Sequence, residues 1–262
     1  MKHTKKPKIA FFDFACCEGC QLHVLELEER LLSLLQHVEV VAWREVMSGA
    51  QEDCDIAFCE GSIANEEDLL RIRRIRERTG TMVALGSCAS LGCHNALKNE
   101  LSMREAIDIV YEKGRAMDTI PARPVSDVVT VDYQVLGCPV SLPEFESVFK
   151  RILLGQDHTP PSQPVCVECK HNDYLCVYEK GLFCLGPVTR CGCNAICTAY
   201  GEPCYGCRGL VDDANLRAAV RVLTREQLHG IMREVTRRHR FTEAEIRKKF
   251  GIYNSPAGGT VS

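Results

Sequence analysis

The stretch KIAFFDFACCEGC, residues 8–20, decides the fold expected for this chain. Its first half is almost continuously apolar, which is typical of a strand covered on both faces of a parallel sheet. Its second half turns at once into a cysteine cluster, Cys16, Cys17 and Cys20. In doubly wound parallel sheets, ligands bind outside the carboxyl ends of the strands. The stretch therefore predicts a buried strand that ends at a ligand site.

Beyond this stretch, strand-like and helix-like segments alternate. Short apolar runs predict further strands at 38–43, 55–60, 81–85 and 128–131. Helical periodicity predicts helices over 21–36, over 101–113 with Gly114 as terminator, and from a cap at Ser141 to 154. Asn65 is placed to cap one more helix. This alternation predicts an α/β fold with a doubly wound, mostly parallel sheet.

Composition and charge narrow the class of protein. Of 262 residues, 45% are apolar and 26% are charged, which is ordinary for a globular protein. A net charge of -3 argues against nucleic acid as a partner. No apolar run is long enough to span a membrane, and the basic N-terminus is not followed by an apolar signal core. We therefore expect a cytoplasmic protein.

The cysteines are unusual in number and in distribution. The chain has 17, an odd number that cannot pair completely, and cytosolic proteins seldom keep disulfides. Nine of the cysteines lie within residues 166–207, where apolar periodicity is weak. Metal ligation would have to replace a large core there. With prolines marking a boundary near 160, we expect a first domain over 1–160, a Cys-rich domain over 161–210 and a helical tail over 211–262.

The first constellation of cysteines follows three separate strands. Strands of one parallel sheet end at the same edge, so their turns should bring four thiols together: Cys17, Cys20, Cys88 and Cys138. Four converging thiolates suit zinc or an iron–sulfur cluster. The plain alternative is a set of buried free thiols, which is the expected role of Cys54 and Cys59.

The second constellation lies in the Cys-rich region. Its members form two groups of four: Cys166, Cys169, Cys176 and Cys184, then Cys193, Cys197, Cys204 and Cys207. Cys191 is left over. Structural zinc sites are one explanation, because CxxC pairs are typical of them. Three quartets in one chain favour a series of redox centres, because a closed zinc site needs no neighbour.

Together, these strings resemble the small, electron-transferring subunit of cytosolic [NiFe] hydrogenases, closest to the sulfhydrogenase and viologen-reducing types. The likeness runs from about Lys8 to Leu210 and is carried by FACCEGCQL, DIAFCEGS, ALGSCASLGC, LGCP, PVCVEC, FCLGPVTR, CNAIC and CYGCRG. The resemblance implies a flavodoxin-like first domain, followed by a small irregular cluster domain and C-terminal helices.

The resemblance also implies three [4Fe–4S] clusters. The first constellation would hold the proximal cluster, Cys166, Cys169, Cys176 and Cys184 the distal one, and Cys193, Cys197, Cys204 and Cys207 the medial one. The related subunit of respiratory complex I uses adjacent cysteines, so Cys16 is an alternative to Cys17. Cys191 is likewise an alternative to Cys193. Cys93 is expected to be a packed thiol. His23 and His94 could hydrogen-bond a cluster, or be ordinary polar residues.

The function implied is electron transfer in a soluble [NiFe]-hydrogenase-type complex, an oxidoreductase. Hydrogen chemistry would reside in a large subunit, so this chain would carry no catalytic residue. A further redox subunit, of a flavin/NAD(P) or heterodisulfide-reductase type, would complete the path. The chain has no G-x-G-x-x-G or G-x-x-x-x-G-K motif, so it should not bind NAD or ATP itself. The rival interpretations are a complex I-like quinone-linked subunit and a zinc-knuckle binding module.

Overall fold

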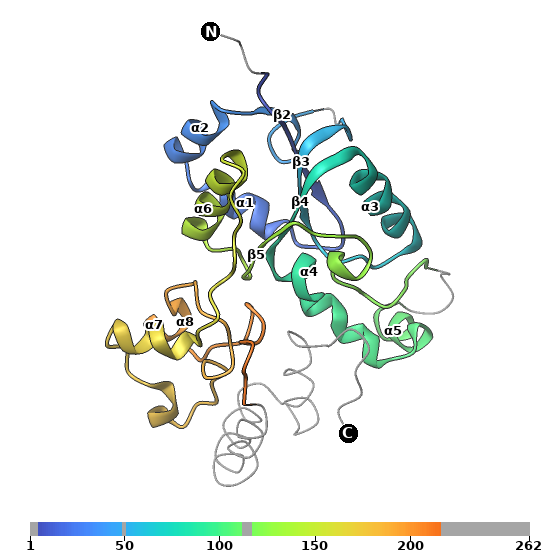
Figure 1. Ribbon diagram of the computed structural model, residues 1–262. Coiled ribbons are helices and arrows are strands. Elements are labelled where there is room, and N and C mark those ends of the chain that lie inside the picture. Colours follow the sequence, from blue (N-terminus) through green and yellow to red (C-terminus); the bar gives the residue numbers. More distant parts are fainter. Residues whose placement is uncertain (1–4, 49–50, 112–116, 216–262) are drawn as a thin grey trace. The chain divides into compact units, whose positions relative to one another are not determined.

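The computed structural model describes residues 5–48, 51–111 and 117–215 (Figure 1). The chain divides into two compact units, residues 1–158 and 159–262. Most of the expected helical tail, and the expected helix terminator Gly114, lie outside the described residues.

The first unit is built on one parallel five-stranded sheet. Its strand order, β2-β1-β3-β4-β5, is that of flavodoxin-like folds, and every neighbouring pair is parallel. The predicted α/β class is confirmed. The strands are β1 (Lys8–Asp13), β2 (Glu39–Ala42), β3 (Cys54–Glu60), β4 (Thr79–Leu85) and β5 (Tyr133–Val135).

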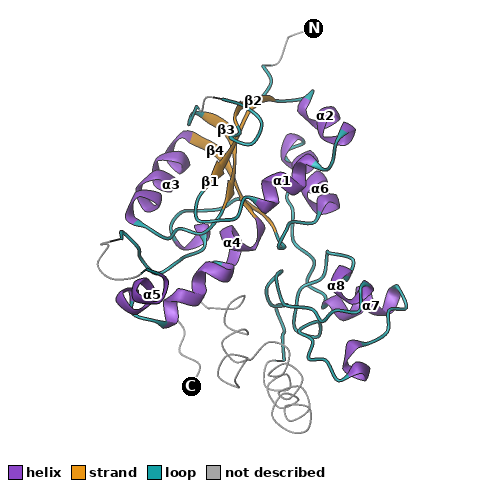
Figure 2. Cartoon of the chain, turned by 180° about the vertical axis from the view of Figure 1, so that it is seen from behind, coloured by secondary structure: helices purple, strands orange, loops and turns teal. Residues whose placement is uncertain are grey.

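Side chains of β1 alternate between two hydrophobic cores, one on each face of the sheet. Ile9 and Phe11 belong to the core under α1 (Gly19–Leu25), α2 (Glu29–Leu35) and α6 (Leu142–Leu153). Ala10 and Phe12 belong to the core under α3 (Glu66–Arg78) and α4 (Gly86–Leu91). Figure 2 shows these two groups of helices on opposite sides of the sheet. Both faces are thus covered, which explains the continuous apolar character of the strand.

The segment 21–36 is not one helix, as its periodicity predicted. It forms α1 and α2, which are separated by a turn in which Glu28 has φ 50°. The prediction was wrong because Leu22 and Leu32, which contributed to the periodic stripe, are exposed. The turn lets each short helix present its own apolar side to the sheet.

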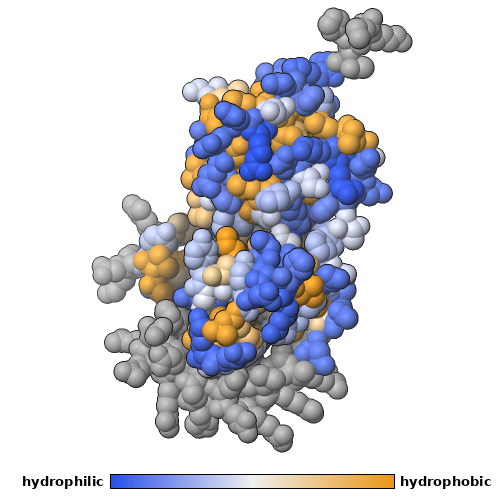
Figure 3. All heavy atoms as spheres, turned by 90° about the vertical axis from the view of Figure 1, so that its left-hand side faces the viewer, coloured by the Kyte–Doolittle hydropathy of each residue, from blue (hydrophilic) through white to orange (hydrophobic). Residues whose placement is uncertain are grey.

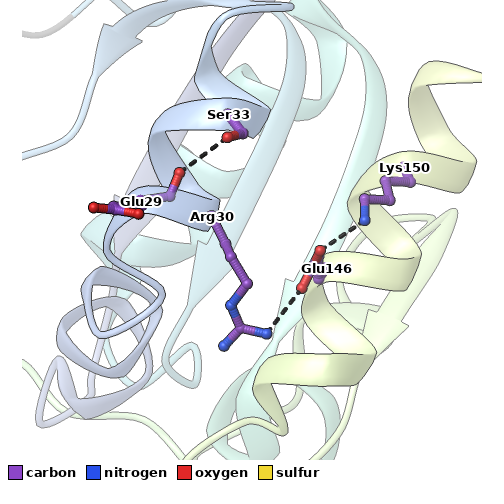
Figure 4. Close-up of polar contacts among 5 residues, drawn as sticks. All are labelled: Glu29, Arg30, Ser33, Glu146 and Lys150. Atoms are coloured by element: carbon purple, nitrogen blue, oxygen red, sulfur yellow. Dashed lines mark hydrogen bonds and ion pairs between the residues drawn. The ribbon is translucent and has the colours of Figure 1, made fainter.

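Helix α2 is tied to α6 at the surface of the same core (Figure 4). Arg30 Nη1 lies 3.3 Å from Glu146 Oε2, and Lys150 Nζ donates to Glu146 Oε1 at 2.6 Å. Within α2, the Ser33 hydroxyl donates to the Glu29 carbonyl at 3.0 Å. These exposed contacts orient the two helices, but exposed ion pairs contribute little free energy.

The predicted strand at 128–131 is also displaced. The strand that joins the sheet is β5, which begins at Tyr133, two residues after the end of the predicted strand. Asp132 explains the shift, because its N–H donates to the Met82 carbonyl at 2.9 Å and its carboxylate accepts from Met82 N–H at 2.8 Å. Val128, Val129 and Val131 instead pack against the core beneath α3.

The helix-capping predictions were correct in position. Asn65 Oδ1 accepts from Asp68 N–H at 2.7 Å and caps α3. Ser141 stands at the N-cap of α6, although its side chain makes no capping hydrogen bond. The predicted helix at 101–113 is shorter in the structure and forms α5 (Met103–Val110), which Ser102 and Glu105 cap reciprocally.

The second unit has little regular structure among its described residues. It contains α7 (Val165–His171), the 3-10 turn η3 (Val177–Lys180) and α8 (Ile196–Ala199). Its buried cluster has six members, and half of them are cysteines: Val165, Val177, Ala195, Cys169, Cys184 and Cys204. No helix in the described part of the chain could cross a membrane. Figure 3 shows one face of the molecule, on which hydrophobic residues lie scattered among hydrophilic ones.

Candidate metal centres

Loops from four neighbouring strands are fastened together at the carboxyl edge of the sheet. Ala15 and Ser62, after β1 and β3, exchange backbone hydrogen bonds of 3.1 and 3.0 Å. Ser87 N–H, after β4, donates to the carbonyl of Gly137, after β5, at 2.8 Å. The three segments that carry Cys17 and Cys20, Cys88, and Cys138 therefore begin at the same edge, with Cys20 in the first turn of α1 and Cys88 within α4.

Gly86 allows the closest approach in this centre. A Cβ atom at Gly86, which has φ +82°, would lie 2.4 Å from Cys20 Sγ. A Cβ at Gly19 would lie 3.2 Å from Cys17 Sγ. Glycine is therefore needed at position 86, both for its backbone conformation and for the space that the thiol occupies.

A buried carboxylate holds the CxxC loop in place. Glu60, at the end of β3, accepts from Cys20 N–H at 3.1 Å and from Gln21 N–H at 3.0 Å. Burial raises the pKa of Glu60, and these hydrogen bonds lower it in part. Burial, together with repulsion from Glu60 and Asp13, raises the pKa of Cys16 to about 12. Cys16 thus faces carboxylates, which disfavour its thiolate form.

Cys138 lies beside Cys93, which the sequence predicted to be a packed thiol. Donor atoms of Cys93, His94 and Cys138 all lie within 4.8 Å of one another. Cys93 is buried, as predicted, but its Sγ also belongs to this group of donors beside Cys138. By contrast, His23 Nδ1 pairs with Glu26 Oε2 at 2.7 Å.

In the second unit, Cys166 lies among the thiols grouped with it by sequence. Burial and repulsion from Cys184, Cys169 and Cys176 raise the pKa of Cys166 to about 11. Cys184 Sγ accepts from the N–H groups of Gly186 and Cys204, at 3.4 and 3.2 Å. Backbone donors of this kind favour a thiolate. A Cβ at Gly186 would lie 3.3 Å from both Cys166 Sγ and Cys184 Sγ, so glycine leaves room between them.

Two charged side chains flank Cys193 in the last group, and sequence reasoning missed both. The Glu168 carboxylate accepts from Gly192 N–H at 2.7 Å and Ala195 N–H at 3.0 Å, and lies 3.9 Å from Cys193 Sγ. Burial and repulsion from Glu168 raise the pKa of Cys193, while Arg208 lowers it in part. The only sequence signal for these two residues was that Glu168 lies inside the string PVCVEC and Arg208 inside the string CYGCRG.

Arg208 is the largest charged group buried in the described part of this unit, with 1% of its surface exposed. Its Nε donates to the Cys191 carbonyl at 2.7 Å. A Cβ at Gly192 would lie 2.3 Å from Arg208 Nη2, so the guanidinium rests against the backbone between Cys191 and Cys193. A cation is thus buried beside a group of thiols, as suits a site that becomes negative when the thiols bind metal.

These donor sets fit iron–sulfur clusters. In a [4Fe–4S] cluster each thiolate binds a different iron, so its four sulfurs spread further apart than the ligands of one ion. Within the described residues, Cys93, His94 and Cys138 form the one group of metal-ligating side chains whose donor atoms all lie within 4.8 Å of one another, and none of the three predicted quartets is that compact. Glycines against thiols at Gly86 and Gly186 leave the room that a bulky inorganic group requires.

The fold and the cysteine-rich edge define the class of hydrogenase-type small subunits. A solved NAD+-reducing [NiFe]-hydrogenase in the H2-reduced state contains a chain that is similar at TM-score 0.54 and 26% identity. The match covers 60% of this chain and 96% of that one. A [NiFeSe]-hydrogenase from Dm. baculatum shares the fold, at TM-score 0.56 and 16% identity, over 82% of this chain and 98% of that one.

Sequence relatives agree. The delta subunit of sulfhydrogenase 2 from Pyrococcus furiosus is 37% identical, over 82% of this chain and 92% of its own. A subunit of the F420-non-reducing hydrogenase vhu from Methanocaldococcus jannaschii is 31% identical, over 80% and 84%. The family model described as NADH ubiquinone oxidoreductase, 20 Kd subunit, matches residues 17–152, and the chain belongs to this family. Within it, the chain is a hydrogenase-type small subunit, part of an oxidoreductase.

Proposed function

We propose that this chain relays electrons through three [4Fe–4S] clusters, between a hydrogen-activating large subunit and a further redox subunit. The observation that carries the proposal is the convergence of four cysteine-bearing positions at one edge of the sheet, with nine more cysteines in a second unit of little core. When bound, such clusters supply one-electron transfer. The residues of this chain would hold them and set their surroundings.

We assign the ligands by quartet. Cys17, Cys20, Cys88 and Cys138 would hold the proximal cluster. Cys17, rather than Cys16, is the residue that the hydrogenase resemblance matches in the string FACCEGCQL. Cys166, Cys169, Cys176 and Cys184 would hold the distal cluster, and Cys193, Cys197, Cys204 and Cys207 the medial one. Around them, Glu60 would orient the CxxC loop, and the N–H groups of Gly186 and Cys204 would stabilise the Cys184 thiolate.

The partners follow from the relatives. The similar chains of sulfhydrogenase 2, of the F420-non-reducing hydrogenase and of the NAD-reducing hydrogenase HoxS from Cupriavidus necator are all named as subunits of larger enzymes. We propose a large subunit bearing nickel and iron at the proximal site, and a flavin/NAD(P) or heterodisulfide-reductase type of subunit beyond the distal site. A cytoplasmic location fits 17 cysteines that are all free in the structure.

The test is metal analysis of the anaerobically purified full chain. We expect about twelve iron and about twelve sulfide per chain, from three cysteine quartets. Stoichiometric zinc with little iron would instead support the zinc-knuckle alternative. A complex I-like subunit needs only one cluster, so an iron content near one third of that expected would favour it. The family match to residues 17–152 stops before the nine later cysteines and does not separate the two interpretations, whereas the relatives that align with 80% or more of this chain are hydrogenase subunits, which supports the hydrogenase interpretation.

The medial ligands are tested by a matched pair of variants, Cys193→Ser and Cys191→Ser. A serine hydroxyl is a poor substitute for a soft thiolate, so Cys193→Ser should remove or alter one cluster signal in low-temperature EPR. Cys191→Ser should cost packing only, because its carbonyl rather than its thiol is engaged by Arg208. The reverse result would shift the medial site by two residues.

A further inference from the structure

Glu168 lies on the helix of one cysteine quartet and binds the loop of the other. It stands inside the CVEC segment of α7, between two of the proposed distal ligands. Its Oε1 accepts from Gly192 N–H at 2.7 Å, and its Oε2 accepts from Ala195 N–H at 3.0 Å. These two N–H groups lie on either side of Cys193, the first cysteine of the proposed medial quartet. One carboxylate therefore joins the two quartets of the second unit.

The loop that Glu168 binds has a backbone that needs support. Asn194 has φ 56° and Ala195 has φ 51°, so both lie in the left-handed region. Asparagine enters this region readily but alanine does not, and such a residue persists only where its surroundings hold it there. The hydrogen bond from Ala195 N–H to Glu168 acts on the strained residue itself. The conformation of the loop that presents Cys193 thus depends on Glu168.

Asn172 adds a second contact from the same side of α7. It lies four residues after Glu168, and side chains at this spacing are neighbours on a helix. Asn172 Nδ2 donates to Asn194 Oδ1 at 2.8 Å. The segments that precede the helix and the loop are also paired, because Cys191 N–H donates to the Gln163 carbonyl at 2.8 Å. The helix of the distal quartet and the loop of the medial quartet are therefore fastened together at several points.

The charge of Glu168 does not explain its place beside Cys193. Its Oε2 lies 3.9 Å from Cys193 Sγ, and burial together with repulsion from Glu168 raises the pKa of this thiol. A carboxylate in this position works against the thiolate that metal binding requires. Arg208 offsets the effect only in part. The hydrogen bonds to the loop are therefore the contribution that accounts for a carboxylate here.

We propose that Glu168 is a positioning residue of the medial cluster: from the helix of the distal quartet, it holds the loop of Cys193 in the conformation that binds iron. The inference rests on the proposed function, because it requires a cluster at the quartet that begins with Cys193. It makes retention of the medial cluster depend on a residue that lies among the distal ligands in the sequence.

The experiment uses the anaerobically purified full chain, in which Cys193→Ser and Cys166→Ser identify the EPR signals of the two second-unit clusters. We expect Glu168→Ala to lose one cluster's complement of iron and sulfide, together with the signal that Cys193→Ser removes. The signal that Cys166→Ser removes should remain. The matched control is Glu179→Ala, because Glu179 is exposed and also lies between two proposed distal ligands. It should keep all three clusters.

The conservative variant Glu168→Gln keeps one accepting oxygen of the two. It should retain more iron than Glu168→Ala, and a chelator should remove its medial cluster faster than that of the unsubstituted chain, with the distal cluster unaffected. Its medial cluster should also have a higher reduction potential, because a negative charge 3.9 Å from Cys193 Sγ is gone. A purely structural role of Glu168 would not raise this potential.

Full iron content in Glu168→Ala, or loss of the distal signal alone, would overturn the proposal. If Glu168→Ala loses both second-unit signals, Glu168→Gln decides. Faster release of its medial cluster with a raised potential supports the proposal, and a release rate or potential equal to that of the unsubstituted chain contradicts it. An unsubstituted chain without iron would overturn the proposed function itself, which separates the two failures.

Discussion

At the scale of single residues, Gly86 is the tightest position of the proximal centre. Gly86→Ala would add backbone strain of about 1 kcal/mol at φ +82° and would push a methyl group against Cys20 Sγ, an overpacking cost of about 1–3 kcal/mol. We expect a lower midpoint of thermal unfolding and loss of iron from one cluster.

Gly155→Ala is the matched control for Gly86→Ala. Gly155 also has a positive φ, +63°, but a Cβ there would meet nothing within 4 Å. The Gly155→Ala variant should lose only the free energy of unfolding that corresponds to the backbone strain, and its iron content should not change. Equal iron contents in the two variants would mean that the space beside Cys20 is not required.

Arg208 is the second decisive residue, because it places a positive charge beside the proposed medial cluster. Arg208→Met should lower the reduction potential of that cluster, since the more negative reduced form loses a neighbouring cation. Removing one partner of a buried charge arrangement also costs about 3–5 kcal/mol. Arg208→Lys keeps the charge but loses the planar guanidinium, so it should preserve the potential better than the stability.

The potential would be measured by redox titration followed by EPR. Arg190→Met is the control, because Arg190 also lies in the second unit, where it pairs with Asp212 and the Pro161 carbonyl. If Arg190→Met and Arg208→Met shifted the potential equally, the effect would be one of net charge rather than of the Arg208 position.

At the scale of elements, helices α3 and α6 both begin at a residue type that favours the N-cap, but only α3 has a side-chain capping hydrogen bond. Asn65→Ala removes the hydrogen bond from Asp68 N–H and should lower the free energy of unfolding by about 1 kcal/mol. Ser141→Ala should have a much smaller effect, because Ser141 occupies the N-cap of α6 without a side-chain bond. Denaturant unfolding of both variants provides the measurement, and similar losses would contradict the structure.

Some helices and strands could be predicted from sequence patterns, and others could not. Strand β1 and helix α3 were predictable, because apolar runs and an Asn cap followed by acidic residues act locally. The break between α1 and α2 was not, because it depends on which leucines the sheet covers. The start of β5 was not predictable either. It depends on hydrogen bonds between Asp132 and Met82, a residue of β4 that lies 50 positions earlier in the sequence.

At the scale of the whole molecule, the two units differ in what holds them together. The first has a hydrophobic core on each face of its sheet, whereas the described part of the second has one small core in which half of the members are cysteines. We expect chelation of iron under anaerobic conditions to unfold residues 165–211 while the sheet remains. Hydrogen exchange would show rapid exchange in 165–211 and continued protection in β1 and β3. Loss of protection in both units together would contradict this expectation.

The sequence by itself determined the class of fold, the family and the cysteine strings, because apolar alternation, turn residues and motif spacing are local properties of the chain. Only the tertiary structure decided that Cys93 joins Cys138, that Glu60 holds the CxxC loop, and that Glu168 and Arg208 flank Cys193. These contacts join residues from different loops and strands. Their distances depend on how the backbone packs, and a linear pattern does not record that.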